Sequence, residues 1–359
     1  MGVVICQSEI SVAQIGNIMS PMRAATLNEA QCSALSLDPS HLPFVSVVVP
    51  ALNEEANLAA LVARLEDVLR AASRAYEIII VDDGSTDNTR ELLCELSLKN
   101  PNLAYLSLSR NFGHQAALIA GLDASTGQVV IMMDADFQHP PELLPKMIAL
   151  WQQGYQVVYT IKIESVSIPF WKRVGMEIGY GVIRRVTGMA LEFGQSDFRL
   201  LDRQVARALE NFPERDKFLR GLVSWVGFRQ IGVQYKTPPR FAGKTKYTLT
   251  ALVRLVASGV FGFSILPLRL FTLVGVIVFL LSCLYAIWAV VLGIHALITG
   301  YSDAVPPGWA SIAAAMAFLG GVQLIGIGLL GEYIGRIYDE AKHRPIYIVN
   351  ERSQPTKNE

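Results

Sequence analysis

From Phe44 onward, short runs of β-branched and aromatic residues alternate with longer segments whose apolar residues recur every three or four positions. The short runs predict strands and the longer segments predict helices. Strands that alternate with helices favour βαβ units and a mainly parallel sheet. The predicted strands are Phe44–Val49, Tyr76–Val81, Leu103–Leu108 and Val129–Met133, and the predicted helices are Glu54–Ala72, Asn88–Lys99 and Gly113–Ala124. The pattern therefore predicts an α/β domain, which we place at residues 44–247.

Two long apolar segments follow this domain. Phe271–Ile294 contains no charged residue, and in Trp309–Leu330 only Gln323 is strongly polar. At about 1.5 Å of rise per residue, each segment is long enough to cross a hydrocarbon layer about 30 Å thick. We predict transmembrane helices at 268–298 and 308–331. The alternative is a buried helical hairpin in the core of a large soluble protein.

Basic residues flank the two predicted spans but are absent between them. Residues 295–308 contain no Lys or Arg, whereas Arg254 and Arg269 precede the charge-free run Phe271–Ile294 and Arg336 and Lys342 follow the second span. Because cytoplasmic flanks carry the excess of basic residues, both termini are predicted to be cytoplasmic.

Three further segments complete the predicted organisation. The apolar spacing from Thr248 predicts a helix on the membrane surface at 248–267, with a soluble-domain helix as the alternative. Residues 332–359 are predicted to form a C-terminal helix and tail, with a short edge strand at Ile346–Val349. Residues 1–43 have mixed polarity and several prolines, and are predicted to be a poorly ordered extension.

Composition agrees with a membrane-bound chain and excludes some partners. The chain is 52% hydrophobic, and its mean hydropathy is +0.35. The 31 basic and 31 acidic residues balance, so nothing indicates a nucleic-acid partner. The four cysteines form no C-x-x-C pair and imply neither a zinc site nor a disulfide framework.

Polar clusters follow three of the predicted strands: residues 53–55, 82–85 and 134–136. Each cluster alone could be a solvated turn or a helix cap. Because parallel strands end at one edge of the sheet, where α/β proteins bind ligands, the three together predict a site. Asp134, Asp136 and Gln138 offer oxygen atoms at alternate positions, which suits Mg²⁺ or Mn²⁺ bound together with substrate phosphates.

Six motifs in order resemble those of the family 2 glycosyltransferases, and more narrowly the bacterial polyprenyl-phosphate glycosyltransferases related to dolichol-phosphate mannose synthase. They are Val-Val-Val-Pro-Ala-Leu-Asn-Glu-Glu (47–55), Val-Asp-Asp-Gly-Ser-Thr-Asp-Asn-Thr (81–89), Ser-Arg-Asn-Phe-Gly-His-Gln-Ala-Ala (109–117), Met-Asp-Ala-Asp-Phe-Gln-His-Pro-Pro-Glu (133–142), Ser-Asp-Phe-Arg-Leu-Leu-Asp-Arg (196–203) and Arg-Phe-Ala-Gly-Lys-Thr-Lys-Tyr (240–247). The resemblance implies a GT-A fold and inverting transfer of a sugar from a nucleotide-diphosphate sugar to a polyisoprenyl phosphate. It also implies a homotetramer in the inner membrane, with the catalytic domain in the cytoplasm.

The resemblance also assigns roles to residues. Asp134, Asp136 and Gln138 would hold the metal ion; Pro50, Asn53, Glu54, Asp82, Asp83 and Asp134 would bind the nucleotide; Lys162, Ser196, Arg199, Arg240 and Lys244 would bind the acceptor phosphate; and Asp134, Asp136, Asp197 and Arg199 would be catalytic. Relatives usually carry Arg directly after the fifth strand, whereas this chain has Lys162, which lacks the bidentate fork of Arg.

Several alternatives remain open at this point. His114 could act in catalysis or only contact solvent or the helix end, and His139 could bind the metal ion directly or only make a hydrogen bond at the metal loop. UDP-glucose and undecaprenyl phosphate are the predicted substrates, with a UDP-4-amino-4-deoxy-arabinose derivative or GDP-mannose as other donors. A processive polysaccharide synthase is disfavoured because the chain has no Q-x-x-R-W motif. A non-catalytic nucleotide-binding membrane subunit is the remaining alternative.

Overall fold

The computed structural model describes residues 25–28, 31, 35–163, 194–212, 214, 219–236, 266–299 and 309–353. Arg240, Lys244 and residues 248–265 of the predicted surface helix lie outside this part of the chain. The chain divides into two compact units, one of Met1–Val256 with Pro345–Glu359 and one of Ala257–Arg344. We describe each unit by itself.

The first unit contains a nine-stranded sheet with the order β1-β8-β6-β7-β5-β2-β3-β4-β9. Most neighbouring strands are parallel, but β7 runs antiparallel between β6 and β5, and β9 runs antiparallel beside β4. The strands are β1 Ala25–Leu27, β2 Phe44–Ala51, β3 Ala75–Asp82, β4 Leu103–Leu108, β5 Val129–Met132, β6 Val157–Ile163, β7 Gln195–Asp202, β8 Gln230–Lys236 and β9 Val349–Arg352. The predicted α/β class with a mainly parallel sheet is confirmed.

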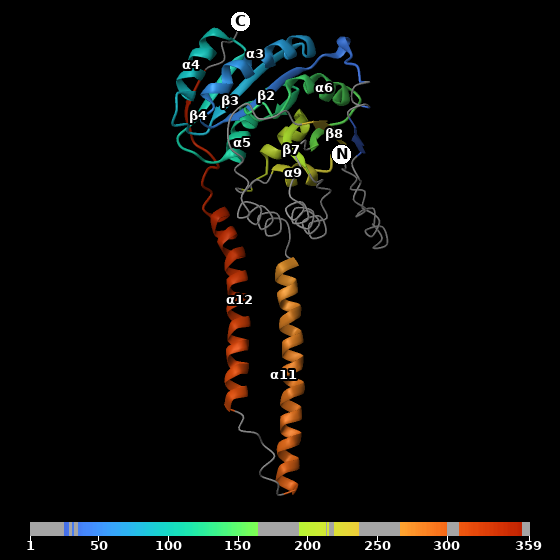
Figure 1. The fold of residues 1–359 in the computed structure, drawn as a ribbon, viewed down its shortest axis with the longest axis vertical. Helices are drawn as coiled ribbons and strands as arrows, with labels where there is room; N and C mark the ends of the chain where they lie inside the picture. The colour runs from blue at the N-terminus through green and yellow to red at the C-terminus, as the bar shows by residue number, and fades with distance from the viewer. Residues whose placement is uncertain are drawn as a thin grey trace, which may run out of the picture. The chain divides into compact units, whose positions relative to one another are not determined.

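Helices cover both faces of this sheet (Figure 1). They are η1 Pro39–His41, α3 Glu55–Ala72, α4 Thr89–Lys99, α5 His114–Ala124, η2 Pro141–Leu143, α6 Leu144–Gln152, α8 Arg203–Glu210 and α9 Leu219–Trp225. The main core packs residues of α3, α4 and α6 against alternate residues of the strands, whereas α5 packs on the other face. Gly121 of α5 allows that close approach, since a Cβ there would lie 2.2 Å from Cγ1 of Val48.

Two pairings in the first unit differ from the sequence predictions. Ala25–Leu27 pairs with Ile231–Val233, so part of the predicted extension 1–43 joins the sheet as an edge strand. Lys162 was predicted to follow the fifth strand of the domain, but it lies within β6 and pairs in register with Tyr235. Three residues, Ala-Thr-Leu, are too few to show a periodicity that would predict an edge strand such as β1.

The C-terminal strand β9 returns the chain to the first unit. It pairs with Leu106–Leu108 of β4, three residues later than the predicted edge strand at Ile346–Val349. The Glu351 carboxylate accepts hydrogen bonds from the Tyr105 hydroxyl and from Arg90. Backbone N–H of Ser353 donates to the Tyr105 carbonyl at 3.0 Å. The edge of β4 is thereby covered by this chain's own last described strand.

The second unit is a pair of long helices, α11 Leu266–Thr299 and α12 Trp309–Ala341. They touch where Gly326 of α12 meets the ring of Phe271, because a Cβ at that position would lie 2.3 Å from the ring. Within the described residues, one segment, Phe318–Ala341, is long and apolar enough to cross a membrane by length and composition, and Leu268–Val278 is a shorter apolar helix. One of the two predicted spans is thus supported.

Candidate active site

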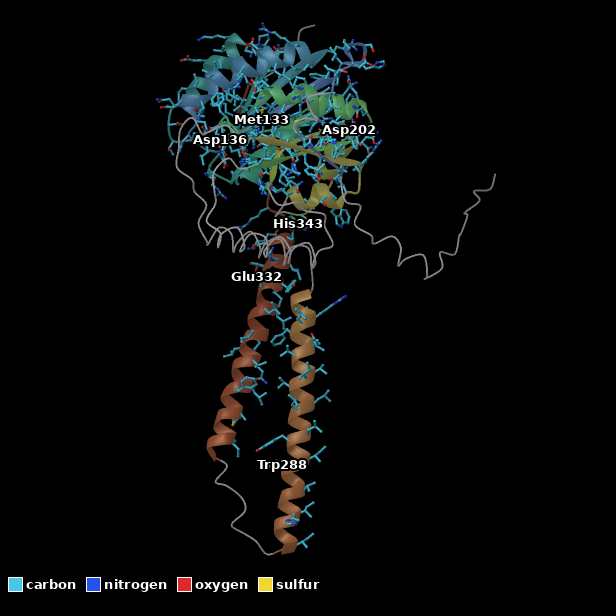
Figure 2. The ribbon with its side chains drawn as sticks, turned by 45° about the vertical axis from the view of Figure 1, so that its right-hand side comes forward. Met133, Asp136, Asp202, Trp288, Glu332 and His343 are labelled. Carbon is cyan, nitrogen blue, oxygen red and sulfur yellow. The ribbon has the colours of Figure 1, made fainter. Side chains whose placement is uncertain are left out.

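The predicted site residues gather where the parallel strands β2, β3 and β5 end. Because β7 is antiparallel to β5, its first residues lie at the same edge, and Met132 pairs with Arg199. Figure 2 shows Met133 and Asp136 at this end of β5, away from Asp202 at the other end of β7. Sheet topology therefore brings the loops after β2, β3 and β5 together with the start of β7.

The carboxylates of Asp82 and Asp83 brace the loops around them. Asp82 accepts hydrogen bonds from the Ser85 N–H and the Ser107 hydroxyl, both at 2.9 Å. Asp83 accepts from the N–H groups of Phe112 and Gly113 at 2.7 and 3.0 Å. Burial raises the pKa of the Asp83 carboxyl, against the effect of these two bonds. The loops after β3 and β4 are thereby held in one geometry.

Asn53 and Glu54 connect the end of β2 to the loop after β3. The side-chain amide oxygen Oδ1 of Asn53 accepts from the Thr86 N–H at 2.8 Å, and the Glu54 N–H donates to the Thr89 hydroxyl at 2.9 Å. Burial raises the pKa of the Glu54 carboxyl, and the negative charges of Asp136 and Asp134 raise it further. The carboxylate of Glu54 therefore interacts with the negative charges of both aspartates. Pro50 is buried within β2 and pairs in register with Val81.

The loop after β5 presents the three predicted metal ligands. Oδ1 of Asp134 is buried and has no hydrogen-bond partner among the described residues. Oδ1 of Asp136 accepts the Gln138 N–H at 3.1 Å, and Oε1 of Gln138 accepts from Lys162 Nζ at 3.3 Å. Among the described residues, no three His, Cys, Asp or Glu side chains lie together as a complete metal site. Two carboxylates and an amide leave room for substrate phosphates to complete a coordination shell.

Fully buried His139 contacts this loop with both ring nitrogens. Nδ1 accepts the Asp134 N–H at 2.8 Å, and Nε2 lies 2.7 Å from the Ser196 hydroxyl oxygen and 3.6 Å from Oδ2 of Asp134. Burial lowers the pKa of the His139 imidazole, which favours the neutral ring. The ring of His139 is thus enclosed by the protein. The side chain of His114, the other histidine predicted near the site, is 43% exposed.

Two arginines hold Asp197 at the start of β7. Arg220 of α9 donates from Nε and Nη2 to the two carboxylate oxygens at 2.8 and 2.6 Å, and Arg199 donates from Nη2 to Oδ1 at 3.3 Å. Burial by itself would raise the pKa of the Asp197 carboxyl, but Arg220 and Arg199 outweigh burial and hold it well below its ordinary range. Asp197 is therefore ionised at neutral pH.

The described acceptor-side residues differ in how accessible they are. Ser196 is 4% exposed and Arg199 is fully buried, whereas Lys162 is half-buried. Nε and Nη1 of Arg199 have no hydrogen-bond partner in the part of the chain that the structure describes. Burial lowers the pKa of this guanidinium to about 10, which still leaves it charged at neutral pH. Of the three, Lys162 is the one placed to meet a ligand without prior movement.

Two residues gain importance from the structure. Arg220 was not among the predicted site residues, because its sequence neighbours resemble no motif and only the fold places α9 against Asp197. His114 was weighed in the sequence, and its Nε2 lies 3.4 Å from Oδ1 of Asp134 and 3.8 Å from Oδ2 of Asp197. His114 therefore lies between the loop after β5 and the arginine-bound Asp197.

Comparison with known proteins identifies the family. Residues 46–209 match the model of glycosyl transferase family 2, and residues 266–337 match that of the GtrB C-terminal hairpin. An uncharacterized glycosyltransferase of Synechocystis is 42% identical over 86% of this chain and 95% of its own length. The chain belongs to glycosyl transferase family 2. It is thus a glycosyltransferase by descent.

One further relative and one solved structure are similar to this glycosyltransferase. The bactoprenol glucosyl transferase of Shigella phage SfV is 37% identical over 86% of this chain and 99% of its own length. Among solved structures, the mannosyltransferase PcManGT of Pyrobaculum calidifontis, in complex with GDP-Man and Mn²⁺, covers 86% of this chain and 89% of its own. It matches at 17% identity with a TM-score of 0.46, a likeness too low to inform the substrates of this chain.

The pairing of Asp197 with two arginines predicts a pH-dependent loss of stability in this glycosyltransferase. Asp197→Asn leaves the buried guanidinium of Arg199 and the partly exposed guanidinium of Arg220 without their carboxylate, which costs about 3–5 kcal/mol of unfolding free energy at pH 7. Because the folded pKa of Asp197 is lowered, its contribution is fully present above about pH 4 and is lost as pH falls below that value. Thermal unfolding in mild detergent, followed by circular dichroism from pH 7 to pH 2, measures the difference.

The matched control is Asp67→Asn, an exposed carboxylate of α3, which is expected to change the unfolding free energy by less than about 0.5 kcal/mol. An Asp197→Asn variant that unfolds at the wild-type temperature at pH 7 would show that the ion pairs add no stability.

Proposed function

We propose that this glycosyltransferase transfers glucose from UDP-glucose to undecaprenyl phosphate, with inversion at the anomeric carbon, at the cytoplasmic face of the inner membrane. The observation that carries the proposal is the match to the phage bactoprenol glucosyl transferase over 99% of that protein, which spans both the catalytic domain and the hairpin. A soluble acceptor would need no such hairpin. A lipid-borne acceptor explains why both parts occur in one chain.

The proposed metal site consists of Asp134, Asp136 and Gln138, holding Mg²⁺ or Mn²⁺. The buried Oδ1 of Asp134 supports it, since this oxygen accepts no hydrogen bond within the described residues and has only the imidazole of His114 at 3.4 Å. The charges of Asp136 and Asp134 add to burial in raising the pKa of Glu54, and a cation would offset those charges. When bound, a divalent ion neutralises charge on the departing nucleoside diphosphate. The residues themselves orient the diphosphate at the edge of the sheet.

The proposed nucleotide pocket is lined by the loops after β2 and β3. Asn53 and Glu54 contribute from the first loop, with Pro50 near the end of β2, and Asp83 contributes from the second loop, with Asp82 as the last residue of β3. Since Asp82 and Asp83 each accept two hydrogen bonds from the surrounding loops, their main contribution is to fix the shape of the pocket. A carboxylate has about four acceptor positions, so Asp83 keeps capacity for a ribose or base contact.

The proposed nucleophile is an oxygen of the lipid phosphate. A phosphate monoester has a second pKa of about 6 and is largely ionised at neutral pH. No strong general base is therefore required to deprotonate the nucleophile. What the acceptor needs is a cation that holds its charge in line with the anomeric carbon. Half-buried Lys162 supplies it, and the proposed acceptor side also includes Asp197, Arg199 and Ser196, together with Arg240 and Lys244, which lie outside the described residues.

Transfer of label to lipid tests the proposed reaction. Purified protein with radiolabelled UDP-glucose, undecaprenyl phosphate and Mn²⁺ or Mg²⁺ is expected to yield organic-extractable label, and a chelator should abolish it. Asp136→Ala should lower the rate by at least about 100-fold, since it removes charge stabilisation from the leaving group. Asp67→Ala is the matched surface control and should be unaffected.

The donor is the part of the proposal most easily overturned. Extractable label from GDP-mannose or a UDP-4-amino-4-deoxy-arabinose derivative, but not from UDP-glucose, would replace the proposed sugar and keep the reaction. Nucleotide binding by calorimetry without transfer from any donor would instead identify a non-catalytic nucleotide-binding subunit.

The acceptor role of Lys162 predicts a selective change in kinetics. Lys162→Met is expected to raise KM for the lipid phosphate about tenfold or more, the loss of one charge-assisted hydrogen bond, with KM for UDP-glucose unchanged. Lys162→Arg keeps the charge and should retain most of the affinity. Lys99→Met, at an exposed site of α4, is the control. Equal changes in KM for the lipid phosphate and KM for UDP-glucose would show that Lys162 does not act at the acceptor phosphate.

We also propose two membrane spans, at 268–298 and 308–331, cytoplasmic termini and a homotetramer. The small residues Gly320, Gly321 and Gly328 of α12 support oligomer formation, because small residues let membrane helices approach closely. Native mass analysis in mild detergent should give four chains, and a monomer would contradict the proposal. Reporters fused to the N-terminus and to the C-terminus should both be found in the cytoplasm. A C-terminal reporter on the opposite side of the membrane would mean that the chain crosses it only once.

A further inference from the structure

His139 is the one fully buried polar ring at the loop after β5, within the part of the chain that the structure describes. Its contacts with Asp134 are to both the backbone and the carboxylate. Nδ1 accepts the Asp134 N–H at 2.8 Å, while Nε2 lies 3.6 Å from Oδ2 of the same residue. The ring of His139 thus contacts both the backbone N–H and the carboxylate of Asp134.

These contacts determine where the ring proton lies. A backbone N–H can only donate, so Nδ1 must accept and carries no proton. The proton of the neutral ring is therefore on Nε2, which donates to the Ser196 hydroxyl at 2.7 Å. With both nitrogens engaged, the ring has no lone pair left for a metal ion. His139 is accordingly excluded as a direct metal ligand in this arrangement.

The ring itself is fixed by the strands on which it packs. It stacks on Phe198 of β7, with centroids 5.0 Å apart and planes 17° from parallel. Tyr235 of β8 meets it edge-on at 6.4 Å. Ser196, which accepts from Nε2, also accepts from the Phe198 N–H at 3.3 Å. Two strands of the sheet therefore determine the orientation of a ring that belongs to the loop.

The loop needs such support. Phe137 has a φ of 58°, in the left-handed region that non-glycine residues rarely adopt, at a cost of about 1–3 kcal/mol. Strained loop residues persist only where surrounding contacts hold them. Between Asp134 and His139, the hydrogen bond from the Asp134 N–H to Nδ1 closes the loop across this residue. Without it, Asp134 and Asp136 would be free to separate.

We propose that His139 is a positioning residue that holds Asp134 in the geometry needed for metal binding, through its Nδ1 contact to the Asp134 N–H and its Nε2 contact to Ser196. The role rests on the proposed function, since it presumes that Asp134 is a metal ligand. Outer contacts of this kind typically change metal affinity by about 10–100-fold when they are lost.

Two substitutions separate the two ends of the ring. In His139→Asn the side-chain oxygen takes the place of Nδ1 and can still accept the Asp134 N–H. In His139→Gln the amide reaches the place of Nε2, but nothing replaces Nδ1. Binding of Mn²⁺ in the presence of UDP, followed by electron paramagnetic resonance on the full chain in detergent, measures the affinity of each variant. Circular dichroism confirms that each is folded.

The expected order of Mn²⁺ affinity is wild type, then Asn, then Gln, with Gln about 10–100-fold weaker than wild type. His41→Asn, at an exposed histidine, should bind as wild type does. A merely structural role would weaken both variants alike, so an Asn variant no better than Gln overturns the proposal. A Gln variant with wild-type affinity overturns it as well.

The same measurements can refute the proposed metal site and the proposed role of His139 separately. If wild type itself binds no Mn²⁺ with UDP, the assignment of Asp134 as a ligand is wrong, and the positioning role falls with it. If wild type binds and the variants bind equally, only the role of His139 is refuted. Should the Gln variant not fold, Ser196→Ala replaces it: a several-fold weaker affinity is expected, and an unchanged one overturns the proposal.

Discussion

Parallel pairing of β2, β3 and β5 brings the carboxylates of Glu54, Asp134 and Asp136 to one edge of the sheet, where the charges of the two aspartates add to burial in raising the pKa of the Glu54 carboxyl. Two like charges about 4 Å apart repel by about 4 kcal/mol at an effective dielectric constant of about 20. A typical hydrogen bond contributes only about 0.5–1.5 kcal/mol net. Charge of this density therefore needs several donors or a cation, and much of the loop structure around the site consists of such donors.

The opposite sign gathers a short distance along the same edge. Asp197 is shared by two guanidinium groups, Arg199 and Arg220, so this cluster carries a net positive charge, and Lys162 lies on neighbouring β6. His114 lies between the two halves. On the proposed function, the acidic half serves a metal-bound diphosphate and the basic half serves an anionic lipid headgroup. The edge of the sheet thus separates the leaving group from the nucleophile by charge.

Local patterns predicted the parts of this arrangement that repeat along the chain. The strands from Phe44 to Met132 and the polar residues at their ends follow from periodicity and from the rule that parallel strands share an edge. What the patterns did not show depended on contacts between distant segments. Ser196 and Arg199 stay predicted acceptor residues, but their burial was not foreseen, because it comes from the insertion of β7 between β6 and β5. No local signal distinguishes an arginine in an interior strand from one at a surface.

The same limitation applies to Arg220 and His139. Arg220 belongs to a short helix without a motif, and only packing of α9 brings it to Asp197. His139 stands in a motif, yet its function depends on Phe198 and Ser196, some sixty positions later, which receive its ring. Sequence spacing placed His139 near the site but not Arg220, and the partners of both residues required the fold.

Strand β9 gives the catalytic sheet an unusual order of assembly. Its residues follow both long apolar helices in the chain, yet they pair with β4, which is made long before them. A ribosome builds the chain from the N-terminus, so the edge of β4 stays open until the hairpin has been synthesised. Unpaired edges invite association with other chains. The nascent enzyme therefore carries an exposed edge while both long helices are being made, and only a chain that has completed its hairpin can close it.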